Sequence, residues 1–307
     1  MSISASIRLP VGMHVFERGW LSSNNILLID EASATLVDSG YQTHAEQTLA
    51  LLQAALKGRE LSTLINTHLH SDHCGGNALL QSVYACRTLV PIAELAAVKE
   101  WDQQLLSFSA TGQRCERFRQ DGCISPGDTL RLANLDWQVL AAPGHDPHSM
   151  MLYCEFEGIL ISADALWEHG FGVIFPELEG ESGFAEQAAV LQLISELDLR
   201  LVIPGHGAPF TDVTAALDRA RSRLAYLSAD SSRNARNALK VLIAFLLLDR
   251  QQFSLLEIQR QLRASRLMAA AAAQLAIPIE LLIEQLAGEL VSSGAASLKN
   301  GILKNAR

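Results

Sequence analysis

The sequence predicts a layered α/β protein in which one β-sheet packs on another with helices outside, followed by a smaller helical region. Three observations support this. Short β-branched runs alternate with helical patterns through the first two hundred residues, and strand-like patterns stop at about residue 213. Apolar residues make up 49% of the 307 positions, enough to bury a large core. We therefore expect one domain over residues 1–212 and another over residues 213–307.

The elements of the first region follow in order. A hairpin is expected from two apolar runs, 25–30 and 33–38, and it leads into a Ser-Gly turn at 39–40. Leucine and alanine then recur at helical spacing over 44–56, and an apolar strand covers 61–67. Further strands are expected at 129–132, 136–141, 150–155, 158–162 and 199–204, with a helix at 183–197 before the last of them.

The second region is rich in Ala, Leu and Arg, and helix is expected as far as Ser292. Ser254 is a good N-cap, Pro278 can open the last helix and Gly294 can end it. Residues 295–304 contain an Asn-Gly turn and predict a small hairpin. Three helices followed by a hairpin are a winged-helix plan.

Composition also bears on the compartment. The longest apolar run, Val241 to Leu248, is too short to span a bilayer and is interpreted as a buried helix. Residues 1–10 lack the basic start and apolar stretch of a secretory leader. Five cysteines, at 74, 86, 115, 123 and 154, form no C-x-x-C pair and are odd in number, which favours free thiols. We expect a cytoplasmic protein that does not contact membranes.

The densest polar motif follows the strand at 61–67. Residues 67–76 read Thr-His-Leu-His-Ser-Asp-His-Cys-Gly-Gly and place four potential metal ligands within six positions, namely His68, His70, Asp72 and His73. A turn allows alternate side chains to converge, and imidazole and carboxylate are ligands that zinc prefers. Gly75 and Gly76 are expected to permit a tight backbone passage into the following helix.

Three further candidate ligands stand at the ends of predicted strands. They are His145 after Pro143-Gly144, Asp164 after Ser162-Ala163, and His206 after Pro204-Gly205. Each is flanked by glycine or another small residue that allows an exposed loop. Together with the motif at 67–76, these make four matches, which would rarely arise by chance on an unrelated scaffold. We therefore predict one composite metal site.

In this order along the chain, the pattern resembles that of the metallo-β-lactamase-fold hydrolases, over about residues 10–212. The resemblance implies a four-layer αββα sandwich with two metal ions at one edge of the sheets. Position by position, it implies that His68, His70 and His145 hold one ion, that Asp72, His73 and His206 hold the other, and that Asp164 bridges both. Asp38, in the sequence Val-Asp-Ser-Gly, matches an aspartate near the site in that family.

The implied chemistry is hydrolysis by a hydroxide that bridges two divalent cations. Asp72 is the candidate catalytic residue, because it could orient the nucleophile and carry its proton while also binding metal. Zinc is the expected metal, although a mixed His/Asp set also accepts iron or manganese. The expected substrate is a small molecule with an ester, thioester or lactone bond.

Several branches of the family differ at these positions. True β-lactamases usually carry cysteine where Asp164 stands, and diiron flavoproteins carry glutamate where His70 stands, so neither activity is expected. Endoribonucleases share the full ligand set, and mononuclear-iron persulfide dioxygenases keep most of its histidines. A phosphodiesterase or nuclease and an oxidoreductase therefore remain as alternatives. A metal-binding protein without activity is a third class, disfavoured because buried charges cost stability without metal.

Two segments are expected to shape the pocket. Residues 165–180 supply apolar side chains for a wall, Trp167, Phe171 and Phe175, with Glu168 and His169 as polar contacts. The alternative is that these aromatics only anchor their loop. Residues 101–122 interrupt the strand pattern and are expected to form a second lid. His148 and Asp146 replace small residues of many relatives next to His145, and His148 either contacts substrate or points to solvent.

Charge is unevenly distributed. Residues 1–214 hold 11 Lys and Arg against 26 Asp and Glu, whereas residues 215–307 hold 13 against 7. A nucleic acid could follow the basic side chains, but aromatic stacking residues are scarce there and the first region is acidic. We favour an intramolecular fit, with a lid or homodimer role for the second region. The basic side chains in question are Arg219, Arg221, Arg223, Arg233, Arg236 and Lys240.

Overall fold

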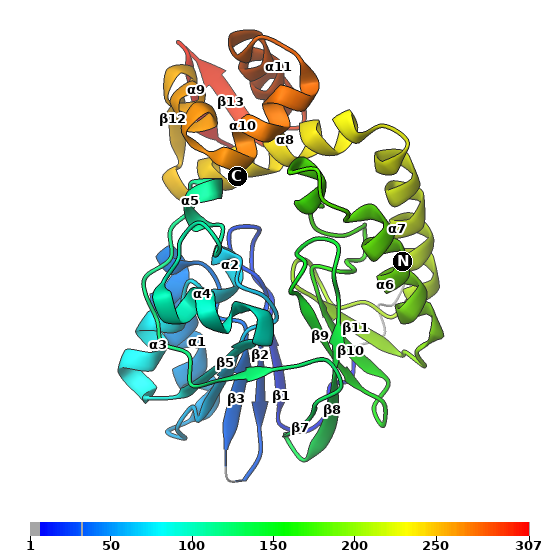
Figure 1. The fold of residues 1–307 in the computed structure, drawn as a ribbon. Helices are drawn as coiled ribbons and strands as arrows, with labels where there is room; N and C mark the ends of the chain where they lie inside the picture. The colour runs from blue at the N-terminus through cyan, green and yellow to red at the C-terminus, as the bar shows by residue number, and fades with distance from the viewer. Residues whose placement is uncertain (1–6, 32, 307) are drawn as a thin grey trace, which may run out of the picture.

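The computed structural model describes residues 7–31 and 33–306, and it contains two facing β-sheets flanked by helices with a helical region across one end (Figure 1). The prediction that no secretory leader is present concerns residues 1–10, of which 1–6 lie outside this range. The first sheet has the order β1-β2-β3-β4-β5-β6 and the second β11-β10-β9-β8-β7. The strands of the first sheet are β1 Met13–Phe16, β2 Asn25–Ile29, β3 Ala34–Val37, β4 Thr63–Ile65, β5 Arg87–Pro91 and β6 Gly122–Ile124. Those of the second are β7 Thr129–Leu132, β8 Leu135–Ala141, β9 Met150–Cys154, β10 Ile159–Ala163 and β11 Leu201–Pro204.

The two sheets follow one pattern. In the first, β1 to β3 pair antiparallel and β3 to β6 pair parallel. In the second, β7 to β10 pair antiparallel and β11 joins β10 in parallel. Parallel pairing requires crossover connections, and in this chain they contain helices or long loops. The predicted hairpin is confirmed, because Ile26 pairs with Val37 and Ile29 with Ala34.

Side chains from the inner faces of both sheets form the central core. Ile26, Val37 and Ile65 from the first sheet pack in one cluster with Trp137 and Leu152 from the second. Trp137 is completely buried and is the largest such side chain. Burial of this apolar surface holds the sheets together face to face.

Helices cover the outer faces, as the αββα prediction requires. Leu52 and Leu56 of α1 and Leu80 of α3 pack on the first sheet. Val190 and Leu191 of α6, with residues of α7, pack on the second. In Figure 1 these two helical layers lie on opposite sides of the paired sheets. The helices of this region are α1 Ala45–Leu56, α2 Ser71–Cys74, α3 Asn77–Tyr84, α4 Leu95–Glu100, α5 Phe108–Thr111, α6 Phe184–Glu196 and α7 Val213–Ser228, with short 3₁₀ turns η1 Gln42–His44, η2 Ile92–Glu94 and η3 Pro176–Leu178.

The C-terminal region contains four helices and a small sheet. Its elements are α8 Ser231–Arg250, β12 Gln252–Ser254, α9 Leu255–Ala264, α10 Arg266–Leu275, α11 Ile279–Ser292, β13 Ala296–Lys299 and β14 Ile302–Asn305. The expected hairpin β13–β14 is present, and Ser254 forms a capping box with Glu257. The expectation that residues up to Ser292 contain helices without any strand is wrong at β12, which pairs with β14, and the described residues after 230 contain four helices rather than three in the whole region. Three residues are too few to show strand periodicity in a sequence.

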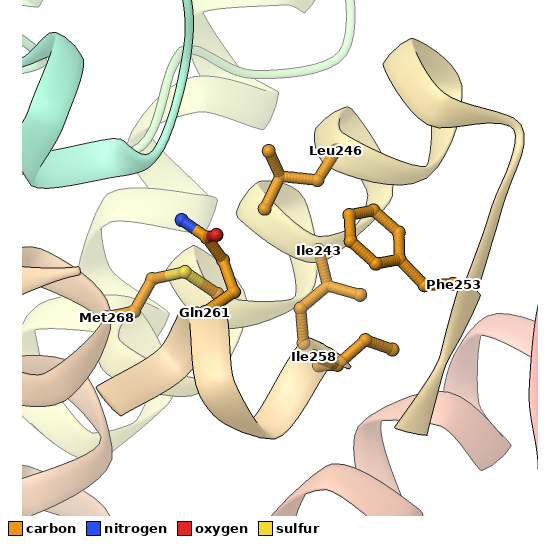
Figure 2. A pocket seen from close by; sticks show the side chains of 6 residues that line it. All are labelled: Ile243, Leu246, Phe253, Ile258, Gln261 and Met268. Atoms are coloured by element: carbon orange, nitrogen blue, oxygen red, sulfur yellow. The ribbon is translucent and has the colours of Figure 1, made fainter. Parts of the chain in front are cut away.

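Apolar side chains join these C-terminal elements. Figure 2 shows Ile243 and Leu246 of α8 facing Phe253 of β12 and Ile258 of α9. All four side chains belong to a larger buried cluster that extends into α10 and α11. Among the described residues no single helix is long and apolar enough to cross a membrane. The pair α10 and α11 passes the same criteria together, but it is bent by 96°.

The C-terminal region is tied to the sandwich at several points. The predicted buried helix around 241–248 is part of α8, and its Phe245 contacts Tyr41 edge to face at 5.0 Å. Arg114 pairs with Asp249 at 2.8 Å, and Arg266 pairs with Glu179 at 2.8 Å. α8 therefore lies across the end of the sandwich where both sheets stop (Figure 1).

Candidate metal centre

All seven predicted ligands come together at one edge of the two sheets. His68, His70, Asp72 and His73 follow β4 of the first sheet, and the last two lie on the short helix α2. His145 follows β8, Asp164 follows β10 and His206 follows β11, all in the second sheet. The site therefore lies where strands of both sheets end, and the ligands of the motif at 68–73 become neighbours of three ligands distant in sequence.

Three histidine nitrogens form the first cluster. Nδ1 of His70 lies 3.1 Å from Nε2 of His68 and 2.8 Å from Nε2 of His145. The three ligand atoms satisfy the spacing of a shared cation. This is the trio that the resemblance implied for one metal.

The second cluster contains Asp72, His73 and His206, also at metal-ligand spacing. Oδ2 of Asp72 lies 3.0 Å from Nε2 of His206 and 3.9 Å from Nε2 of His73. Oδ2 of Asp164 lies 3.4 Å from Nε2 of His145 in the first cluster, and 3.5 Å and 3.8 Å from Nε2 of His73 and His206 in the second. One carboxylate oxygen thus faces both clusters, as a bridging ligand would.

The donor set fits two cations. The ring of His73 is completely buried, and its Nε2 has no hydrogen-bond partner among the described residues. An orphaned ring nitrogen of this kind costs free energy unless a cation or a proton satisfies it. Imidazole nitrogens and carboxylate oxygens at this spacing suit Zn²⁺, Fe²⁺ or Mn²⁺.

Other groups fix the orientation of the ligands. Asp38 accepts a hydrogen bond from Nδ1 of His73 at 2.8 Å and is itself held by the backbone N–H and hydroxyl of Thr67. The carbonyl of Val173 accepts from Nδ1 of His145 at 2.5 Å. In both histidines Nε2 is therefore left to face the cluster, which is the usual arrangement of metal-ligating imidazoles.

Backbone shape positions the bridging aspartate. Ala163 has a left-handed φ of +46°, and the pairing of β10 with β11 shifts register between Ile161 and Ala163. A non-glycine residue in this conformation is strained, and such strain concentrates at functional sites. The irregularity ends the strand and turns Asp164 toward the histidines.

Glycines allow close approach to the ligands. A Cβ on Gly172 would lie 2.4 Å from the ring of His145, and one on Gly205 would lie 2.2 Å from Oδ1 of Asp164. The tight backbone passage predicted at Gly75 and Gly76 does not depend on backbone dihedrals, because their φ angles of −64° and −84° are open to any residue. Their role is close packing instead: added Cβ atoms would lie 2.4 Å from the backbone N of Gln42 and 2.6 Å from the carbonyl of Ser39.

The two clusters differ electrostatically. Burial lowers the pKa of His145 to about 4, with repulsion from His70 adding to the effect. Burial and neighbouring histidines also hold the pKa of His68 well below its usual value. Burial opposes protonation of His73 as well, but Asp164, Asp38 and Asp72 outweigh it and raise the pKa of His73 well above its usual value. The low pKa values favour neutral imidazoles in the first cluster, whereas a cation in the second would have to displace a proton that the raised pKa of His73 favours.

A cavity of about 810 Å³ opens from the ligands. The predicted side chains Trp167, Glu168, His169, Phe171 and Phe175 all line it. Nε1 of Trp167 donates to Oδ1 of Asp164 at 3.2 Å. The segment 101–122 reaches the cavity through Thr111 and Gln113.

His148 lies elsewhere. It is not among the cavity-lining residues, and its Nδ1 lies 2.7 Å from Oε1 of the buried Glu94. That hydrogen bond, opposed by burial, raises the pKa of His148. Its neighbour Asp146 lies 3.5 Å from Nε2 of His70, on the side of that ring away from the other ligands.

Sequence reasoning missed several cavity residues. Trp20 stacks on His206 at 5.3 Å with 10° between the rings, yet it stands in a loop without any recognisable pattern. A further set comes from α7 and from the C-terminal region, where the helical periodicity shows which face is apolar but not what that face covers. Those residues are Arg223, Asn237, Val241, Leu242, Ala244, Phe245, Leu247, Leu248, Leu290, Ala295 and Asn305.

The comparisons with known proteins agree with this geometry. The family model described as the metallo-beta-lactamase superfamily matches residues 18–206. A hydroxyacylglutathione hydrolase of Rhodopseudomonas palustris (strain BisB5) is 27% identical over 155 residues, which are 50% of this chain and 52% of that protein. The chain thus spans about half the length of this curated relative.

Solved structures extend the likeness. A metallo-beta-lactamase family protein from Thermus thermophilus has a TM-score of 0.57 at 22% identity, covering 96% of this chain and 99% of that one. The likeness in fold therefore includes the C-terminal region. The protein TTHA1623, in a di-iron-bound form, has a TM-score of 0.54 at 25% identity and covers 67% of this chain and 98% of that one.

Proposed function

The chain belongs to the metallo-beta-lactamase superfamily, and from that premise we propose that it is a metal-dependent hydrolase that cleaves a thioester, lactone or ester. One observation carries the proposal. Oδ2 of Asp164 lies within hydrogen-bonding or metal-ligand reach of nitrogens from two separate ligand clusters. A shared carboxylate between two such clusters is suited to a pair of cations that act together.

In this proposal His68, His70 and His145 hold one cation, Asp72, His73 and His206 hold the second, and Asp164 contacts both. The cations would supply Lewis acidity and lower the pKa of water, which is the chemistry that hydrolysis needs. Asp72 lies in the cavity wall with its side chain 13% exposed, so it can reach an attacking water and carry its proton. Asp38 and the carbonyl of Val173 keep two of the imidazoles in the required orientation.

The walls of the cavity favour an acyl substrate. Trp167, Phe171 and Phe175 line it beside the ligands, and α8 adds a largely aliphatic surface opposite. A cavity with few polar groups around a cluster of ligands suits an apolar acyl group better than a naked phosphate. The relative named for hydrolysis of hydroxyacylglutathione is consistent with this substrate class.

Zinc is the proposed metal, and iron or manganese is the alternative. The His/Asp donor set suits all three, and the similar protein TTHA1623 has been observed in a di-iron-bound form. A mononuclear-iron oxidoreductase is the runner-up activity. Such an oxidoreductase needs one metal ion per chain, whereas the complete second ligand cluster favours two metal ions.

A nucleic-acid substrate is less favoured. Arg236 and Lys240 pair with Glu289, Arg233 stacks over Tyr226, and Arg219 donates to the carbonyl of Glu168. Most of the basic side chains that could follow a phosphate backbone thus interact with other groups of the same chain.

We propose that residues 213–307 form a winged-helix domain that covers the cavity. A homodimer and a cytoplasmic location remain predictions.

The test is metal analysis of the purified protein together with a substrate panel. We expect two ions per chain and turnover of thioesters, lactones or esters, with none of phosphodiesters or single-stranded RNA. One ion per chain with oxygen consumption on a persulfide would favour the oxidoreductase. RNA cleavage with a steep salt dependence would favour the nuclease.

A further inference from the structure

The cavity contains two polar side chains that have no function in metal binding. Arg223 of α7 and Asn237 of α8 both line it. Nε of Arg223 and Nδ2 of Asn237 are buried without a hydrogen-bond partner in the part of the chain that the structure describes. Most buried polar atoms in folded proteins are paired, so two orphaned donors in one cavity indicate a missing acceptor.

Arg223 is the more informative of the two. Within the described residues it makes no ion pair, and its guanidinium lies over the ring of Phe171 at 5.6 Å. Its aliphatic part packs against Gly170, where an added Cβ would lie 2.9 Å from its Cδ. The side chain is therefore held in place at the cavity wall, half-buried, while its charge lacks a counterion. Burial also lowers the pKa of Arg223, which shows that desolvation acts on the charge.

The surface that α8 adds to the cavity is largely apolar, and the charged side chain Glu168 on the loop beside Arg223 lies 3.8 Å from His169. Val241, Leu242, Ala244, Phe245 and Leu248 of α8 line the cavity. A ligand that fills the cavity would meet ligating residues at one end, an aliphatic surface along α8, and a single uncompensated cation on α7. Arginine is well suited to carboxylate or phosphate because its planar group forms paired hydrogen bonds with them.

We propose that Arg223 binds an anionic group of the substrate, so that the substrate is an amphipathic acyl ester or thioester bearing a carboxylate or a phosphate. Asn237 donates to a neutral acceptor of the same molecule. The apolar part of the substrate lies along α8. This inference rests on the proposed function for the scissile bond, but the anion subsite itself can be tested without turnover.

The decisive measurement is calorimetric binding of octanesulfonate, with octanol as the neutral control, to the metal-loaded protein. Sulfonate is a weak metal ligand and reports on the subsite directly. We expect Arg223→Gln to weaken octanesulfonate binding by about 10- to 100-fold, Arg223→Lys to restore part of it, and octanol to bind all variants alike. Arg221→Gln, an exposed position on the same helix, is the matched control and should bind as the parent does.

The kinetic arm distinguishes the source of the anion. Three substrates are compared. Octanoyl-coenzyme A carries phosphates on its leaving group, and a monothioester of suberate carries a carboxylate at the end of its acyl group. Octanoyl-N-acetylcysteamine is neutral and serves as the control. Arg223→Gln should raise KM for one of the two anionic substrates and leave the neutral one unchanged. Equal octanesulfonate affinity in parent and Arg223→Gln, or no binding to either, would overturn the subsite. Absence of turnover with every ester would instead overturn the proposed function.

Discussion

The two walls of the cavity are built on different principles. On the sandwich side, hydrogen bonds within the chain orient the ligands: Asp38 fixes His73, the carbonyl of Val173 fixes His145, and Asp164 faces both ligand clusters. On the other side α8 presents a largely aliphatic surface, and two donors beside it, Nε of Arg223 on α7 and Nδ2 of Asn237 on α8, have no partner among the described residues. The first wall leaves ligand atoms such as Nε2 of His73 for a cation, whereas the second leaves donors for an acceptor group of a substrate. In the proposed function, reactivity and selectivity would therefore depend on separate parts of the chain.

The largest expected effect comes from the sandwich wall. Asp164→Ala removes the oxygen that faces both clusters, so bound metal and turnover should be lost together, with kcat/KM lower by at least about 1000-fold. Metal content and rate should be measured on the same preparation. Asp136→Ala, at an exposed position 65% accessible to solvent, is the control and should change neither. Full occupancy and full rate in the Asp164 variant would refute the site.

Loss of Asp38, which orients a ligand without being one of the seven, should have a smaller effect. Asp38→Ala leaves all seven ligands but frees Nδ1 of His73, so metal affinity should fall by about 10- to 100-fold. Competition with a chelator of known affinity measures this. An unchanged affinity would show that the hydrogen bond from His73 does not orient its ring.

A substitution in the α8 wall should affect long acyl substrates and not short ones. Val241→Asp places a carboxylate in the aliphatic surface at a half-exposed position, where the cost to folding is small. We expect kcat/KM for a decanoyl thioester to fall by about 10-fold and that for an acetyl thioester to remain unchanged. The matched control is Val83→Asp, a similarly exposed valine on α3. Equal losses for both chain lengths would indicate a general disturbance of the fold.

Acid should weaken the metal-free protein. Because the pKa of His145 is about 4 in the fold and about 6.5 in the unfolded chain, the unfolded state takes up a proton first as the pH falls. The stability linked to this group is therefore present above pH 6.5 and lost toward pH 4, a change of about 3 kcal/mol when complete. Urea unfolding across this range measures it, and His145→Gln should flatten the dependence.

For the second cluster we expect a smaller and opposite effect, because the pKa of His73 is raised whereas that of His145 is lowered. Asp164, Asp38 and Asp72 keep the pKa of His73 well above its usual value despite burial, so the metal-free protein holds a proton there at neutral pH. Metal binding should then release about one proton per chain. Calorimetric titration in buffers of different ionisation enthalpy counts it, and the absence of release would contradict the charge on His73.

The sequence predicted the sandwich wall far better than the α8 wall. The ligands lie at strand ends with dense, regular spacing, so chemistry and position are both visible in the chain. The hairpin at 25–38, the helix at 45–56 and the cap at Ser254 follow from local patterns. Strands β1, β5, β6 and β12 were not predicted, because their pairing with neighbouring strands, rather than a pattern within each segment, defines them.

The α8 wall depends on docking rather than on local pattern. Periodicity shows that residues 241–248 present an apolar face, but only the contact of Phe245 with Tyr41 and the ion pair of Arg114 with Asp249 fix where that face lies. For the same reason Trp20 could not be identified from its loop, and the hydrogen bond of His148 to Glu94 leaves no trace in the sequence.

The placement of the tryptophans gives the protein an intrinsic optical reporter. Of its four indoles, Trp20 stacks on His206 and Trp167 donates to Asp164, while Trp137 lies deep between the sheets and Trp101 packs against Phe108 and Phe118. Half of the fluorophores thus touch ligating residues and half do not. The intensity of tryptophan fluorescence should therefore change as cations bind, without any added dye. Variants that lack Trp20 or Trp167 would show which indole gives the change.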